Sequence, residues 1–367
     1  MSTPGRRRLP AGTARVLRLG LVAPLVVGLT AVLWLALPLW LLGAAAVSPW
    51  VPGRWRALRL AWLAVVYLTM ETVLLAVLLG LWLSSGFGRR LRTPYFEGIH
   101  YDLVQGVMWV LFSEARRVLH LSITTVGPAP DAHPGHPLLV CCRHAGPGDS
   151  FTLVHALMDW YDREPRVVLK DTLAWDPVIG CLLTRLPARF ISPSPGDGED
   201  LESQIASLAT GLDRDDAFVI FPEGGNFSPE RRERAIARLH RLGLHAMAGR
   251  AEAMLHVLAP KPGGLLAALE AAPEADVVMV AHTGLDHVLG VRDLWRELPM
   301  DKRITMRWWQ VPRAEIPTDR DEQIAWLYDW WERIDAWVEE HRPEDLPARR
   351  RSHRPLTPAA DRGRART

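Results

Sequence analysis

The first quarter of the chain is so apolar that it constrains the fold before any motif is considered. Leu19 to Val47 carries no charge and is long enough to cross a hydrocarbon layer of about 30 Å. Leu60 to Leu83 is a second such stretch, interrupted only by Glu71. The two stretches predict a membrane hairpin of two helices. It either spans the bilayer or is re-entrant, since Pro24 and Pro38 would allow a kinked, half-inserted helix.

Arginines flank this predicted hairpin unequally. Those outside it are Arg6, Arg7, Arg8, Arg15, Arg18, Arg89, Arg90 and Arg92, whereas Arg54, Arg56 and Arg59 lie between the two stretches. Positive charge favours the cytoplasmic side, so both the N-terminus and the long C-terminal part are expected in the cytoplasm, at the inner cell membrane. Glu71 is either a functional acid within the membrane or a carboxyl group that faces its partner helix.

Composition narrows the class of protein further. The chain has 367 residues, a formal net charge of +2 and no basic stripe interleaved with aromatic residues, so no nucleic-acid partner is expected. Three cysteines fit a reducing compartment and give no disulfide framework. We expect a basic N-terminal segment (1–18), a membrane hairpin (19–92), one folded domain (93–342) and a disordered tail rich in arginine and proline (343–367).

After the hairpin, apolar runs typical of buried strands alternate with segments of helical periodicity. Strands are expected over 121–126, 138–142, 167–169, 189–191, 217–221, 277–281 and 304–311, and helices over 101–119, 151–161, 177–186, 199–212 and 321–340, with a charged helix that opens after Ser228. This alternation predicts an α/β fold, a mainly parallel sheet with helices on both faces. The tryptophans of the last helix have the spacing of residues that pack on the sheet, with contact to the bilayer interface as the alternative.

Two motifs stand at the ends of predicted strands, where the sites of α/β proteins lie. His144 follows the apolar run 138–142 directly, and it is the one histidine with an aspartate, Asp149, five positions later. Phe221-Pro222-Glu223-Gly224 ends the next buried run. A histidine that acts as a general base needs an orienting carboxylate, so the spacing of His144 and Asp149 favours acid–base chemistry.

With these motifs the chain resembles the glycerolipid acyltransferases typified by 1-acylglycerol-3-phosphate acyltransferase, over roughly 121–287. The family's blocks begin with His-x4-Asp and include Phe-Pro-Glu-Gly. Looser counterparts of its other two blocks begin at Lys170 and at Val257. The resemblance implies that His144 and Asp149 are catalytic. It also implies that Phe221, Pro222, Glu223, Gly224 and Lys170 shape the site that binds the acceptor.

The chain departs from the family at two positions. Arg143 stands before the histidine, where the family commonly has asparagine or a small residue, and Gly225-Asn226 replaces the usual Thr-Arg. The arginine of the family helps to hold the acceptor's phosphate, because a guanidinium pairs with two phosphate oxygens at once. Arg231 and Arg232 are candidates to supply that charge, unless the acceptor has no phosphate monoester.

The inferred reaction is acyl transfer from coenzyme A or acyl carrier protein to a lipid hydroxyl, with the acyl carrier as co-substrate and no cofactor or metal. Gly146 and Gly148 would either let backbone N–H groups approach the thioester oxygen or simply form a tight turn. A hydrolase would need Gly-x-Ser-x-Gly, which is absent from the sequence. A lipid-binding protein without turnover is the alternative of another class. The spacing of His133, His136, Cys141, Cys142 and His144 fits no common zinc pattern.

Overall fold

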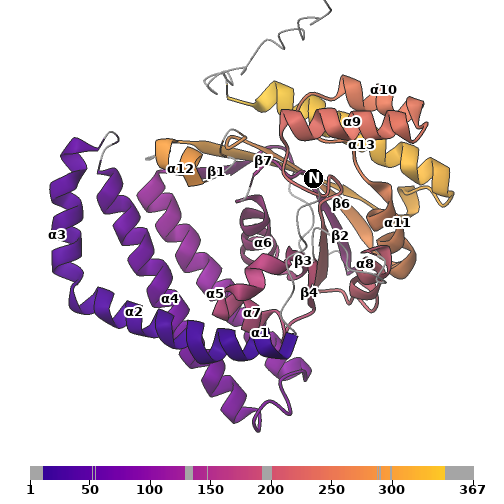
Figure 1. Cartoon of the computed structure of the whole chain (residues 1–367). Helices are drawn as coiled ribbons and strands as arrows, with labels where there is room; N and C mark the ends of the chain where they lie inside the picture. Colours follow the sequence, from indigo (N-terminus) through magenta and orange to yellow (C-terminus); the bar gives the residue numbers. More distant parts are fainter. Residues whose placement is uncertain are drawn as a thin grey trace, which may run out of the picture.

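The computed structural model describes residues 11–51, 53, 55–128, 135–146, 148–191, 201–286, 288, 291–297 and 300–343. Within them the chain forms a seven-stranded sheet of order β1-β7-β6-β2-β5-β3-β4, flanked by helices (Figure 1). The strands are β1 (Ser122–Thr125), β2 (Leu138–Cys142), β3 (Glu164–Lys170), β4 (Ala188–Ile191), β5 (Asp216–Ile220), β6 (Asp276–Thr283) and β7 (Arg303–Val311). All seven strands predicted from the sequence are present.

The sheet is mainly parallel, as predicted, but one edge runs the other way. The strands β6, β2, β5, β3 and β4 are parallel neighbours. Strand β7 pairs antiparallel with β6, and β1 pairs parallel with β7, so these two strands oppose the rest. The parallel part matters for function, because it places the carboxyl ends of β2, β5, β3 and β6 on one edge of the sheet.

Helices cover both faces of the sheet, as the sequence predicted. The helices of this domain are α5 (Pro94–Leu119), α6 (Asp149–Asp159), α7 (Pro177–Leu182), α8 (Leu201–Ala209), α9 (Pro229–Arg241), α10 (His245–Ala253), α11 (Pro262–Ala271), α12 (Val291–Glu297) and α13 (Arg320–His341). Helix α6 buries Leu153 and Leu157 against one face. Helices α8, α10, α11 and α13 pack on the other, which includes the buried Trp331 and Trp337 of α13. These two tryptophans therefore pack in the core, as their spacing predicted.

The apolar N-terminal region forms an open arm of helices beside this domain (Figure 1). Its elements are α1 (Ala11–Leu17), the π-helix η1 (Arg18–Val22), α2 (Ala23–Leu35), α3 (Leu37–Val47) and α4 (Arg56–Ser84). Gly12–Leu35 and Arg56–Ser84 are long and apolar enough to cross a membrane. The first stretch breaks at Ala36, directly before the helix that contains Pro38, because a proline cannot continue the hydrogen bonding of the helix before it.

Polar side chains tie the arm together and tie it to the domain. Thr30 donates from Oγ1 to the carbonyl of Leu68 (3.1 Å), which joins α2 to α4. Helix α4 then runs along the domain: Trp62 donates to Glu114 of α5 (2.7 Å), and Tyr67 donates to Asp176 at the start of α7 (2.5 Å). Glu71, one turn after Tyr67 on α4, is buried, with 5% of its surface exposed. The predicted segments 1–18 and 343–367 lie largely outside the described residues.

Candidate active site

His144 and Asp149 meet at the carboxyl end of β2. His144 follows the strand by two residues, and Asp149 is the first residue of α6. The histidine's Nδ1 lies 3.4 Å from Oδ2 of Asp149, and both side chains are mostly buried. A proton on Nδ1 would face the carboxylate and leave Nε2 to accept a proton from a substrate. The distance is longer than a strong hydrogen bond, as is common in catalytic pairs without bound substrate.

The turn between these two residues is hydrogen-bonded to Asp149. Gly146 donates its backbone N–H to Oδ2 of Asp149 (2.5 Å), and the carbonyl of Gly146 accepts from the backbone N–H of Asp149. The N–H of Gly146 is therefore bonded to Asp149 and does not face a thioester oxygen. Of the two roles considered for Gly146, the structure shows the tight turn. The imidazole of His144 also lies against the ring of Phe221, with 4.5 Å between the ring centroids.

A second histidine that the sequence did not single out approaches the same carboxylate. His282 lies near the end of β6, the strand beside β2, where Val280 pairs with Cys142. Its Nε2 is 3.6 Å from Oδ2 of Asp149 and 3.1 Å from the carbonyl oxygen of Arg143. Burial by itself would raise the pKa of Asp149. His282, His144 and the Gly146 N–H outweigh burial and hold that pKa below its ordinary value. Asp149 is thus kept ionised as the partner of His144.

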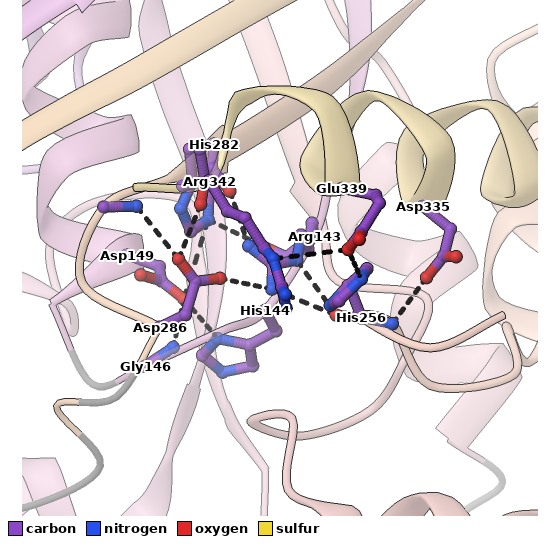
Figure 2. A network of polar contacts seen from close by, with 12 residues as sticks. Arg143, His144, Gly146, Asp149, His256, His282, Asp286, Asp335, Glu339 and Arg342 are labelled. Carbon is purple, nitrogen blue, oxygen red and sulfur yellow. Dashed lines mark hydrogen bonds and ion pairs between the residues drawn. The ribbon is translucent and has the colours of Figure 1, made fainter. Parts of the chain in front are cut away.

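Arg143 turns the opposite way from His144 and enters the protein interior. Its exposure is 1%, which makes it one of the largest fully buried side chains. The guanidinium donates to the carbonyls of His282 (2.5 Å) and His256 (3.0 Å), and it forms an ion pair with Asp286 at 2.5 Å (Figure 2). Burial opposes the charge, but Asp286 and Glu223 outweigh it, and the pKa of Arg143 lies above its ordinary value.

Side-chain alternation along β2 explains why Arg143 points inward. Leu139 and Cys141 pack in the core beneath α11 and α13, and position 143 continues the same face of the strand. Figure 2 shows that Arg143 contacts His256, which also lies beside Asp335 of α13. Asp335 accepts the backbone N–H groups of Leu255 and His256. Arg143 therefore anchors the loop of His144 to the helix layer behind the sheet.

Glu223 holds the backbone of His144 in place. One carboxylate oxygen accepts the backbone N–H of His144, and the other accepts that of Leu258, both at 3.0 Å. Its exposure is 2%. Burial raises the pKa of Glu223, while the two N–H donors and Arg143 oppose that shift. A carboxylate enclosed in this way does not face a substrate. This corrects the expectation that Glu223 binds the acceptor, and we describe it as a residue that positions His144.

The rest of the Phe-Pro-Glu-Gly motif joins two loops. Pro222 is buried, and its carbonyl accepts the backbone N–H of Lys261 (2.8 Å). Gly224 has a φ of 68°, in the left-handed region that glycine adopts without strain, and it donates to the carbonyl of Phe221. Phe227 donates to the carbonyl of His144 (2.6 Å). The motif therefore lies between the loop of His144 and the loop that precedes α11.

The two arginines proposed for a phosphate differ in their surroundings. Arg231 is exposed and donates to the carbonyl of Asn226 (3.1 Å). Arg232 donates to the carbonyls of Met254 (2.6 Å) and Glu252 (2.7 Å), so it closes the end of α10. These bonds occupy the guanidinium of Arg232 and speak against its expected role in binding. The backbone of Lys170 ends β3 on the same edge of the sheet, but its side chain lies outside what the structure describes.

The described residues contain no group of three or more histidine, cysteine or acidic side chains arranged to hold a metal. His133, one member of the set considered from the sequence, lies outside the described residues. Cys141 and Cys142 are fully buried in β2, and burial raises the pKa of the Cys141 thiol to about 12. A thiol that resists ionisation is a poor metal ligand.

The site thus holds a histidine with a carboxylate partner at the carboxyl edge of an α/β sheet. Residues 123–283 match the family model described as Acyltransferase. This part of the chain is similar to the acyltransferase family, in agreement with the resemblance found in the sequence. No curated protein matches the chain.

One solved structure similar to this chain is the 1-acyl-sn-glycerophosphate acyltransferase PlsC from Thermotoga maritima. The match has 13% sequence identity and a TM-score of 0.42, and it covers 74% of this chain and 97% of that one.

Proposed function

We propose that the protein transfers an acyl chain from acyl-CoA or acyl carrier protein to the hydroxyl of a membrane lipid, 1-acylglycerol-3-phosphate in phospholipid synthesis. The observation that carries this proposal is the pairing of His144 with Asp149 at the end of β2. It occurs within residues 123–283, which match the family model described as Acyltransferase. Amphiphilic substrates also give a reason for the apolar helical arm beside the site.

The proposed reaction needs no covalent acyl-enzyme, because the thioester is already activated. The hydroxyl oxygen attacks the thioester carbonyl carbon while its proton passes to Nε2 of His144. The carbon–sulfur bond then breaks, and the leaving thiolate takes up that proton. Asp149 stabilises the imidazolium between these steps. The protein's remaining task is to hold the two substrates in line, which by itself lowers the barrier by several kcal/mol.

The packing of α4 supports a re-entrant arm over a spanning one. Contacts with the domain occur near its start, where Arg56 donates to the carbonyl of Arg296 (2.9 Å). They continue through Tyr67 to Leu78, which packs on α7. If α4 crossed about 30 Å of hydrocarbon, the polar domain that packs along its length would have to lie in the hydrocarbon as well. We therefore propose that the arm lies in the cytoplasmic leaflet of the cell membrane, with the catalytic edge at the lipid surface.

The test uses the full-length protein reconstituted in liposomes. Acyl-CoA and acyl carrier protein are each offered with 1-acylglycerol-3-phosphate, other lysophospholipids and a glycolipid acceptor, and mass spectrometry identifies the products. Transfer to 1-acylglycerol-3-phosphate supports the proposal. If another acceptor is acylated faster, that acceptor is the substrate and 1-acylglycerol-3-phosphate is not. Failure to acylate any acceptor with either donor would favour a lipid-binding protein without turnover.

A further inference from the structure

A cavity of about 270 Å³ lies at the edge of the sheet opposite His144. Strand β3 begins at this cavity with Glu164, and β5 begins directly after Asp215, another residue of its lining. Strands β2, β5 and β3 are parallel, so the amino ends of β3 and β5 lie on the other side of the domain from the carboxyl end of β2. A molecule in this cavity therefore does not reach His144 and is not a substrate of the proposed reaction.

The lining of this cavity is mainly acidic. Four of its charged residues are acidic and one is basic: Asp102, Asp162, Glu164, Asp215 and Arg163. Arg163 is 2% exposed and directs its guanidinium to the backbone carbonyls of His136 and Arg214. Helix α6 also ends here, with Met158 in the lining, and the C-terminal end of a helix carries partial negative charge. The cavity therefore favours a positively charged ligand.

Glu164 carries a charge that the fold does not neutralise. Its partner across the sheet is Asp216, which Arg166 binds through Nε (2.8 Å) and Nη2 (2.6 Å). In the described part of the chain, no cation or hydrogen-bond donor pairs with the carboxylate of Glu164. Burial and then Asp216 raise the pKa of Glu164 to about 7. The other acids that act on it are Asp213, Glu97 and Asp215. A bound cation would oppose this rise in pKa.

Tyr101 of α5 brings a hydroxyl group without a partner to the same cavity. Its side chain is 4% exposed, and its Oη is buried and makes no hydrogen bond. Buried polar groups are nearly always hydrogen-bonded, so a hydroxyl left without a partner beside a cavity indicates that a bound molecule completes it. Burial and the charge of Glu164 raise the pKa of Tyr101, which keeps the hydroxyl neutral and its oxygen able to accept an N–H group.

We propose that this cavity binds a small organic cation, a protonated diamine or polyamine, with Glu164 as its ion-pair partner and Oη of Tyr101 as acceptor of one N–H group. The exposed Asp102, Asp162 and Asp215 at the rim would face a second ammonium group of such a chain. A metal ion fits less well, because the described residues hold no group of three or more acidic, histidine or cysteine side chains arranged for one. The inference is independent of the proposed acyl transfer.

The variants Glu164→Gln and Tyr101→Phe test this site in the full-length protein, and both keep the size of the side chain. Glu274→Gln, an exposed glutamate outside the cavity, is the matched control. Putrescine, spermidine and, at equal ionic strength, Mg²⁺ are titrated by calorimetry while the thermal unfolding midpoint is followed in parallel. We expect both amines to stabilise the wild type and the control. Glu164→Gln should bind them at least about tenfold more weakly, and Tyr101→Phe about three- to tenfold more weakly.

Two outcomes of these titrations would overturn the site. One is equal binding of the amines by the wild type and both variants, since this is the behaviour of diffuse attraction to acidic surface. The other is stabilisation by Mg²⁺ as strong as that by spermidine, since a site shaped for an organic cation discriminates between them.

Proton release gives a second measurement that a purely structural role of Glu164 would not change. Glu164 is partly protonated near pH 7 in the empty cavity, and a bound ammonium group stabilises its ionised form. Calorimetry at pH 7 in two buffers of different ionisation enthalpy should therefore show that amine binding releases a fraction of a proton in the wild type and none in Glu164→Gln. The same proton release in both proteins would refute the ion pair with Glu164.

Discussion

Replacing Glu223 by glutamine separates positioning of His144 from binding of substrate. In the wild type both carboxylate oxygens accept a backbone N–H, one from His144 and one from Leu258. A glutamine of the same shape offers one oxygen, and its amide NH2 then faces the other N–H group. One buried donor loses its partner, which costs about 1–3 kcal/mol. For a domain of this size the thermal midpoint should fall by about 2–4 °C for each kcal/mol.

The same substitution should lower kcat and leave KM nearly unchanged. Freed from one anchor, the loop of His144 would shift by a fraction of an ångström relative to the acyl donor and acceptor. Misalignment of that order lowers the rate by about ten- to a hundredfold. The assay compares kcat, KM and the unfolding midpoint of Glu223→Gln with those of Glu274→Gln, an exposed glutamate outside the site. A large rise in the KM of the acceptor with an unchanged midpoint would refute the positioning role and restore Glu223 as a direct ligand.

Three further changes test other ionisable groups. Arg143→Met leaves the mostly buried Asp286 without its ion-pair partner and should lower the free energy of unfolding by about 3–5 kcal/mol; Arg143→Met with Asp286→Asn should regain part of this, and equal losses would argue against the pair. His282→Gln should lower kcat about three- to tenfold at constant KM, because Asp149 loses a stabilising neighbour; a rate equal to that of His240→Gln, an exposed control, would contradict this. Glu164 lies far from the base, and burial and then Asp216 raise its pKa to about 7. A carboxyl with a raised folded-state pKa contributes stability below about pH 4.5 that is lost as pH rises through 7, so Glu164→Gln should gain stability relative to the wild type from pH 5 to 8. A difference that stays constant over that range would contradict the shifted pKa.

The parts of the structure predicted well from the sequence depend on local pattern. Buried runs and helical periodicity located all seven strands, and the spacing of His144 and Asp149 placed both at one strand end. The reversed direction of β1 and β7 was not predicted, because an apolar strand reads the same whichever way it pairs.

Residues that are distant in the sequence and meet only through strand pairing could not be predicted from local pattern. His282 reaches Asp149 only because β6 lies beside β2, although well over a hundred residues separate them in the chain. Arg231 and Arg232 are adjacent in sequence but about 100° apart around α9. One therefore faces the turn of the motif, and the other closes the end of α10. The loop that holds Lys261 reaches the same motif because Pro222 and Glu223 accept the backbone N–H groups of Lys261 and Leu258.

The most direct test of the acyl-transfer mechanism is the kcat of His144→Ala and Asp149→Asn on the best acceptor in the reconstituted membrane. Without the base at Nε2 the alanine variant should lose about 10²–10⁴-fold in kcat. The asparagine variant should also fall, because an amide no longer stabilises the imidazolium or fixes its tautomer. Unfolding midpoints close to that of the wild type would show that the loss is chemical. Wild-type rates in both variants would contradict the mechanism.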